Sequence, residues 1–184
     1  MASDGDTIVA IASPAGMGAV SLIRLSGPQS CEIAQKVIGF RALPPARKVG
    51  LRSIVDAEGL VIDEGLWVTF SGPASYTGED VAEFTGHGGV MVTRKVIERL
   101  IEAGARPAEP GEFTQRAFLN GRLDLTQAEA VMDLISAQTS LALRSATEQL
   151  EGRLGQRCEE IRADLLGATA HLEAYIDFPE EDID

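Results

Sequence analysis

Short apolar runs dominate the first two thirds of the chain. They are rich in β-branched and aromatic residues and are bounded by glycine, proline or aspartate, which is typical of strands. We predict strands at 7–12, 19–25, 50–55, 61–70 and 80–85. Two further segments, 31–39 and 89–104, have apolar residues at helical spacing. The resulting order, β-β-α-β-β-β-α, predicts an α+β domain with a mixed or antiparallel sheet that ends near residue 120.

From Leu125 onward, apolar residues recur at intervals of three or four positions, which predicts amphipathic helices. We expect one helix near 126–137 and a second from about 140 to 176. Thr126 and Glu129 have the spacing of a capping box, so the first of these helices is expected to begin near Leu125. Thr139 or Ser140 is expected to cap the second helix.

The sequence therefore predicts two domains, at 1–120 and 121–184. A single long amphipathic helix cannot cover its own apolar stripe. The stripe requires a partner surface, which could be the first domain, a second copy of the chain or helices encoded beyond Asp184.

The net charge of -12 lies mostly in the second part of the chain. Residues 1–122 contain 14 acidic and 12 basic side chains, whereas residues 123–184 contain 14 acidic and 4 basic ones. Nucleic-acid affinity depends on Lys and Arg side chains that neutralise phosphates. We therefore expect this chain alone to bind tRNA weakly or not at all.

Composition also limits the location and the chemistry of the protein. No apolar run approaches the ~20 residues of a membrane span, and the first residues lack the pattern of a signal peptide, so we expect a cytoplasmic protein without membrane contact. Cys31 and Cys158 are expected to be reduced thiols that act as small core residues. Two distant cysteines and two distant histidines form no ligand set, so no metal site is expected.

Two opposite charges interrupt apolar rows of the predicted strands. Strand alternation places Arg24 on an apolar row of 19–25 and Glu83 on a row of 80–85. An unpaired buried charge costs several kcal/mol, so each group must meet a partner or a ligand. From the residues alone, a simple salt bridge between Arg24 and Glu83 and a ligand site both remain open.

The segment 110–130, PGEFTQRAFLNGRLDLTQAEA, is unusually dense in charged, amide and glycine residues. The side chains that can face a core are those of Phe113, Ala117 and Phe118, while those of Glu112, Arg116, Asn120 and Arg122 stay polar. This composition fits either a functional site or an ordinary surface loop with a short helix.

Two glycine-rich segments have features of functional motifs, one of a phosphate-binding loop and one of a catalytic histidine. The segment SPAGMGAVS at 13–21 lacks the lysine that a phosphate-binding P-loop requires, so a tight strand connection is the better interpretation. His87 lies between glycines, and no Ser or Cys nucleophile stands in a recognisable arrangement with it. A turn residue is therefore favoured over a catalytic histidine, and no catalytic residue is predicted.

Four separated blocks together resemble one known family. They are DTIVAIASPAGMGAVSLIRLSG at 6–27, YTGEDVAEFTGHGG at 76–89, the segment at 110–130 and AYIDFPEE at 174–181. Their order and spacing are similar to the N-terminal part of the MnmE (TrmE) family of tRNA-modification GTPases. The resemblance implies a folate-binding and dimerising N-terminal domain, followed by a helical domain that a GTP-binding domain interrupts. The chain is expected to stop before that GTP-binding domain.

The resemblance also implies which residues hold the cofactor. Arg24, Glu83 and Arg122 correspond to folate-binding positions of the family, and the expected ligand is a 5-formyl- or 5,10-methylene-tetrahydrofolate. A carboxylate such as Glu83 can accept both hydrogen bonds of the amine and ring N–H of a pterin. Arg24 suits the carboxylates of the folate tail. The family often has Lys where this chain has Arg122, which keeps the charge but changes reach and geometry.

By the same resemblance, the parent protein works with a flavin-dependent partner, MnmG, to modify the wobble uridine of certain tRNAs. GTP, Mg²⁺ and K⁺ would act only in the absent domain, so this chain alone is expected to show no GTPase activity. A purely structural dimerisation scaffold with a degenerate folate site is the main alternative. An independent aminomethyltransferase of the glycine-cleavage type is a third.

Overall fold

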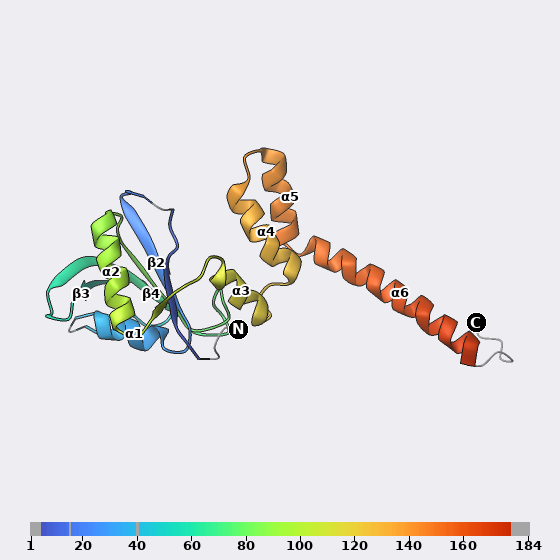
Figure 1. Ribbon diagram of the computed structural model, residues 1–184, viewed down its shortest axis with the longest axis horizontal. Coiled ribbons are helices and arrows are strands. Elements are labelled where there is room, and N and C mark those ends of the chain that lie inside the picture. Colours follow the sequence, from blue (N-terminus) through green and yellow to red (C-terminus); the bar gives the residue numbers. More distant parts are fainter. Residues whose placement is uncertain (1–4, 15, 40, 178–184) are drawn as a thin grey trace. The chain divides into compact units, whose positions relative to one another are not determined.

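The computed structural model describes residues 5–14, 16–39 and 41–177. The chain forms two compact units, Met1–Arg122 and Leu123–Asp184. The first unit contains a sheet and helices, and the second is helical (Figure 1). The α+β fold class expected from the sequence is confirmed.

The first unit is built on a six-stranded sheet with the strand order β3-β4-β5-β2-β1-β6. The strands are β1 (Ile8–Ile11), β2 (Val20–Ser26), β3 (Gly50–Val55), β4 (Val61–Phe70), β5 (Val81–His87) and β6 (Arg106–Pro107). All neighbours are antiparallel except β1 and β6, which are parallel. The five predicted strands are confirmed. The sequence did not predict β6, because a two-residue strand is too short for a periodic signal.

Helices α1 (Ser30–Val37) and α2 (Val90–Glu102) pack against each other and against the same face of the sheet (Figure 1). Their apolar residues join those of the strands in one buried core. This core includes Ile23, Leu25, Ile33, Val37, Ile54, Trp67, Phe84, Val96 and Leu100. The hydrophobic effect of this burial is the main term that holds the unit together.

The opposite face of the sheet is only partly buried. Strand register aligns Leu22, Thr85, Leu66 and Leu51 in one row across four strands. Leu66 is 46% exposed and Leu51 is 51% exposed. The neighbouring row pairs Arg24 with Glu83. The sequence predicted that the strand rows of Arg24 and Glu83 face a core. They belong instead to this outer face of the sheet, opposite α1 and α2.

Helix α3 (Glu112–Leu119) follows β6 and is the short helix that the sequence left open. Glu112 and Arg116 lie on its buried side, at 4% and 5% exposure. Phe118 is instead 39% exposed. The polar residues of this segment are therefore not an ordinary solvated surface.

The second unit contains α4 (Leu125–Ser136), α5 (Ser140–Leu150) and α6 (Arg153–Asp177). The predicted start of α4 near Leu125 is confirmed, but the predicted capping residues are wrong. Asp124 is the N-cap, since its side chain accepts a hydrogen bond from the Gln127 N–H, and the Gln127 side-chain oxygen accepts one from the Asp124 N–H. Thr126 only supports this cap, by donating its hydroxyl to Asp124.

The predicted continuous helix from 140 to 176 is divided in two. Thr139 caps α5 as expected, because its hydroxyl accepts the Ala142 N–H at 3.1 Å. Helix α5 then ends, and Gly152 adopts a positive φ of 86° that disfavours other residue types. No residue of α6 is buried, and its apolar side chains are exposed. They include Leu154, Ile161, Leu165, Leu172 and Tyr175.

Both cysteines are free thiols, as expected. Cys31 is half-buried in α1, where desolvation raises the pKa of its thiol. Cys158 is exposed on α6, so the expected core role is wrong for this residue. Within the described part of the chain, no helix is both long enough and apolar enough to cross a bilayer.

Candidate functional site

The three residues expected to bind a ligand line one pocket of the first unit. Arg24 from β2 and Glu83 from β5 face each other across paired strands, and Arg122 follows α3. The pocket has a volume of about 540 Å³. It is lined by Arg24, Arg47, Phe70, Ala74, Ser75, Tyr76, Val81, Glu83 and Arg122.

Arg24 and Glu83 form an ion pair, with 2.7 Å between Arg24 Nε and Glu83 Oε1. Two aromatic rings flank the guanidinium, since Arg24 Cζ lies 5.0 Å from the ring centroid of Tyr76 and 5.6 Å from that of Phe113. The two charged side chains are 21% and 16% exposed. The pair is therefore closed but still reaches the solvent-filled pocket, and its carboxylate has lone pairs left for a ligand.

The turn after α3 determines the position of Arg122. Gly121 has a positive φ of 68°, and the Arg122 N–H donates to the Ala117 carbonyl at 2.8 Å. The Arg122 side chain lies against Gly78, where an added Cβ would come within 3.1 Å of its Cγ. Within the described ranges, this side chain forms no hydrogen bond or ion pair, so its charge is available to a ligand.

Arg47 is a pocket residue that the sequence did not indicate. Its backbone has a φ of 63°, which is rare for residues other than glycine. Its N–H donates to the Thr69 carbonyl, its guanidinium donates to the Ala74 carbonyl, and its Cζ lies 5.7 Å from the ring centroid of Phe70. Arg47 belongs to an irregular segment between α1 and β3, where no periodic pattern could reveal its role.

This pocket, called the arginine pocket from here on, is positively charged in a strongly acidic chain. Three arginines and one glutamate line it, whereas the whole chain carries a net charge of -12. Such a concentration of guanidinium groups attracts an anion and offers paired donors to a carboxylate or phosphate. The lining thus suits a ligand with an aromatic part, a hydrogen-bond donor edge and negative charge.

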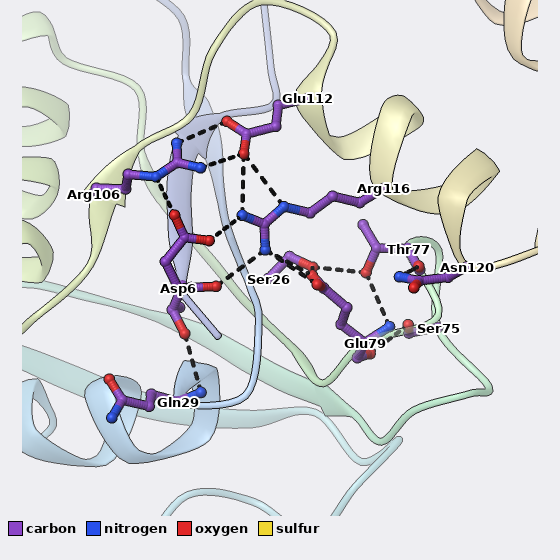
Figure 2. A network of polar contacts seen from close by, with 11 residues as sticks. Asp6, Ser26, Gln29, Ser75, Thr77, Glu79, Arg106, Glu112, Arg116 and Asn120 are labelled. Atoms are coloured by element: carbon purple, nitrogen blue, oxygen red, sulfur yellow. Dashed lines mark hydrogen bonds and ion pairs between the residues drawn. The ribbon is translucent and has the colours of Figure 1, made fainter. Parts of the chain in front are cut away.

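A network of ion pairs is centred on two buried charges of α3, Glu112 and Arg116 (Figure 2). Arg116 contacts three carboxylates, with distances of 2.6 Å to Asp6, 3.1 Å to Glu79 and 3.1 Å to Glu112. Arg106 bridges Asp6 and Glu112 from the other side, at 2.5 Å to each. The network therefore joins the segment before β1, the segment before β5, strand β6 and helix α3.

The network shifts the protonation of its members. Hydrogen bonds from Arg106 lower the pKa of Glu112 from 4.5 to about 2. Hydrogen bonds to Glu112 and Asp6 raise the pKa of Arg106 further above its usual value. Glu112 therefore stays ionised in the folded protein at any physiological pH. Its spacing of four residues from Arg116 on one helix was the only sequence signal of this network.

His87 is the last residue of β5 and not a simple turn residue. Its Nδ1 lies 2.7 Å from Asp63 Oδ1, and its backbone N–H donates to Asp63 Oδ2 at 2.9 Å. The nearby Ser21 hydroxyl donates to the His87 carbonyl. The Ser21 hydroxyl thus bonds to the main chain of His87 and not to its imidazole, so the two side chains do not pair as a nucleophile and its base.

A second, larger hollow of about 620 Å³ lies between the β1–β2 connection and α2. The glycine-rich segment lines this hollow through Ser13, Pro14 and Gly16 to Gly18, and not the pocket that holds Arg24. Its walls are mainly apolar, and they contain no cluster of charges comparable to the arginine pocket. Among the described residues, no group of three or more His, Cys, Asp or Glu side chains is placed to hold a metal ion.

The fold and the pocket define an α+β domain with an arginine-lined pocket, followed by a helical unit, and known proteins share this organisation. The sequence model of one protein family, the GTP-binding protein TrmE N-terminus, matches residues 7–122. The family model of the MnmE helical domain matches residues 125–184. The tRNA modification GTPase MnmE of Akkermansia muciniphila is 53% identical over 179 residues, which cover 96% of this chain and 40% of that protein. The Halorhodospira halophila protein of the same name is 51% identical, over 97% of this chain and 38% of that protein.

The chain therefore belongs to the MnmE (TrmE) family of tRNA modification GTPases. Its two units correspond to the N-terminal domain and to part of the helical domain of the family. The chain spans about 40% of the length of the curated relatives it matches.

Proposed function

We propose that the first unit binds a reduced folate, of the 5-formyl- or 5,10-methylene-tetrahydrofolate type, in the pocket of Arg24, Glu83 and Arg122. The observation that carries the proposal is the meeting of three arginines and one glutamate in a single pocket of about 540 Å³. This volume lies within the usual range of ~300–1,000 Å³ for small-molecule sites.

Each end of a folate finds a chemical match in this lining. The Glu83 carboxylate can accept the paired donors of the pterin edge. The tail carboxylates of the ligand suit the guanidinium groups of Arg24, Arg47 and Arg122, which offer paired N–H donors. The side chains of Phe70 and Tyr76 supply ring faces for the aromatic parts of the ligand.

A titration of the chain with 5-formyltetrahydrofolate tests this proposal directly. We expect Glu83→Gln to weaken binding by about 1 to 3 kcal/mol, since the variant loses hydrogen bonds to a charged acceptor. Glu64→Gln is the matched control, because Glu64 lies exposed on the next strand and outside the pocket. Absence of binding by the unmodified chain would contradict the proposal and favour a structural scaffold with a degenerate site.

We further propose that the chain forms a homodimer through the first unit. The outer sheet face exposes Val20, Leu51 and Leu66 beside the charged row, and exposed apolar patches of this kind mark contact surfaces. A dimer on this face would lie next to the folate pocket, so ligand binding and association would favour each other by mass action.

The relatives carry the name tRNA modification GTPase, and we infer that this chain serves the same process in a parent protein. Its share would be to hold the one-carbon donor and to dimerise in the cytoplasm. Modification of the wobble uridine, hydrolysis of GTP with K⁺ and cooperation with MnmG would belong to the whole protein. The acidic second unit argues against tRNA binding by this chain alone.

A further inference from the structure

Arg116 lies at the centre of the buried network and outside the arginine pocket (Figure 2). Its side chain is 6% exposed and contacts carboxylates from three separate segments of the chain. A buried guanidinium is expensive unless its donors are satisfied, and here Asp6, Glu79 and Glu112 satisfy them. The ion pairs of Arg116 therefore hold these three segments in one arrangement.

Two of the segments that Arg116 joins, residues 75–80 and helix α3, also carry side chains that contact Arg24 of the pocket. Arg116 holds Glu79, and the Ser75 hydroxyl donates to the Glu79 carbonyl at 2.6 Å, which closes the turn that carries Tyr76. Arg116 itself belongs to α3, which carries Phe113. The network thus connects the two aromatic residues that flank the Arg24 guanidinium.

Further hydrogen bonds join the same two segments. The Tyr76 hydroxyl lies 2.9 Å from the Thr114 hydroxyl, and the Asn120 amide donates to the Thr77 carbonyl at 2.8 Å. Ser26, on β2 close to Arg24, donates to Glu79 at 2.7 Å. A shift of either segment would therefore displace the aromatic rings from Arg24.

We propose that Arg116 is a positioning residue of the pocket, which holds the 75–80 segment and α3 together so that Tyr76 and Phe113 keep the Arg24 guanidinium oriented toward its ligand. This role rests on the proposed folate binding. Arg24 forms an ion pair with Glu83, and the two ring faces restrict its remaining freedom. An arginine oriented in advance loses less conformational entropy when it binds an anion.

Arg116→Lys tests the role, because lysine keeps the charge but lacks the planar fork that contacts several carboxylates at once. Glu79→Gln is a second variant, which removes the link to the 75–80 segment without adding volume. Arg106→Lys is the matched control, since Arg106 contacts Asp6 and Glu112 but no residue of the 75–80 segment. Fluorescence of the single tryptophan, the buried Trp67, shows at which temperature each variant is folded.

We expect Arg116→Lys and Glu79→Gln to weaken binding of 5-formyltetrahydrofolate about tenfold in fully folded protein, which corresponds to about 1.4 kcal/mol. Arg106→Lys should leave the affinity within about twofold, or about 0.4 kcal/mol. In an Arg24→Lys background, Arg116→Lys should have little further effect, because the two changes act on the same interaction. The NMR signal of the Arg24 Nε–H, measured without ligand, should move toward the value of a free arginine in Arg116→Lys and in Glu79→Gln, but not in Arg106→Lys.

An unchanged affinity and an unchanged Arg24 signal in folded Arg116→Lys and Glu79→Gln would overturn the positioning role and leave folate binding intact. An equal loss of affinity in Arg106→Lys would also overturn it, since the effect would then come from general destabilisation. If the unmodified chain binds no folate, the proposed function fails, and the Arg24 signal alone decides whether Arg116 positions this pocket.

Discussion

Single residues of this protein show that burial, and not residue type, determines what a charge does. Arg24 and Glu83 are partly exposed at a pocket and remain available to a ligand. Glu112 and Arg116 are of the same types, yet they are buried and satisfied by one another and by neighbouring charges. The first pair is suited to binding, and the second pair to holding the surrounding segments together.

The lowered pKa of Glu112 predicts how stability changes in acid. A carboxyl group whose pKa is lower in the folded state stabilises the fold above its unfolded pKa, and this contribution disappears as the pH falls from about 4.5 to about 2. A difference of this size corresponds to about 3 kcal/mol. We therefore expect the free energy of unfolding, measured by urea titration with Trp67 fluorescence, to fall across this range.

Glu112→Gln should be less stable at neutral pH and should lose most of this acid dependence. Glu98→Gln is the control, because Glu98 forms a pair with Arg94 at the surface, and solvent-exposed pairs of this kind add little to stability. The interpretation fails if Glu112→Gln retains the acid dependence of the unmodified chain.

At the scale of elements, short-range signals position the helices of the second unit. Helix α4 begins where Asp124 and Gln127 exchange hydrogen bonds, and α5 begins at Thr139. Hydrogen bonds from Thr126 and Gln127 also lower the pKa of Asp124, so its carboxylate stays ionised and able to accept these bonds at neutral pH. Gly152 then separates α5 from α6.

Asp124→Ala is expected to destabilise the second unit by about 0.5 to 2 kcal/mol, since it leaves helix N–H groups without an acceptor. Thermal unfolding followed by far-UV circular dichroism measures this effect. Glu129→Ala is the matched comparison, because the sequence pattern pointed to Glu129 while the structure assigns the cap to Asp124 and Gln127. A larger loss in Glu129→Ala than in Asp124→Ala would contradict this assignment.

At the scale of the whole molecule, two apolar surfaces have no covering element among the described residues of their own units. One is the outer sheet face with Leu51 and Leu66, and the other is the apolar side of α6 with Leu165 and Leu172. The sheet face lies beside the proposed folate pocket, because the row of Leu66 adjoins that of Glu83. This proximity favours the sheet face as the dimer contact.

Leu66→Glu is therefore expected to shift a dimer to monomers, because the introduced charge would have to be buried at the contact. Sedimentation velocity at several protein concentrations measures the change. Leu172→Glu, on α6, is the matched control and should leave the dimer intact. A dimer lost only in Leu172→Glu would assign association to α6, and a monomer in every case would reject the proposed dimer.

Local patterns in the sequence were sufficient for most of the fold. Alternation and bounding turn residues specify β1 to β5, and helical spacing specifies α1, α2 and the helical second unit, because each signal depends on neighbours within a few positions. The family resemblance also named Arg24, Glu83 and Arg122, and the structure places all three in one pocket.

Other features depend on residues that are distant in the sequence, so only the tertiary structure decided them. Arg47 joins the pocket because of an irregular backbone, and it lies between elements without periodicity. Arg116 is buried because Asp6 and Glu79, which lie 110 and 37 positions away in the chain, meet it in space. A polar residue in a sequence does not show whether water or other charges will surround it, and that difference separates the partly exposed charges at the pocket from the buried charges that hold neighbouring segments together.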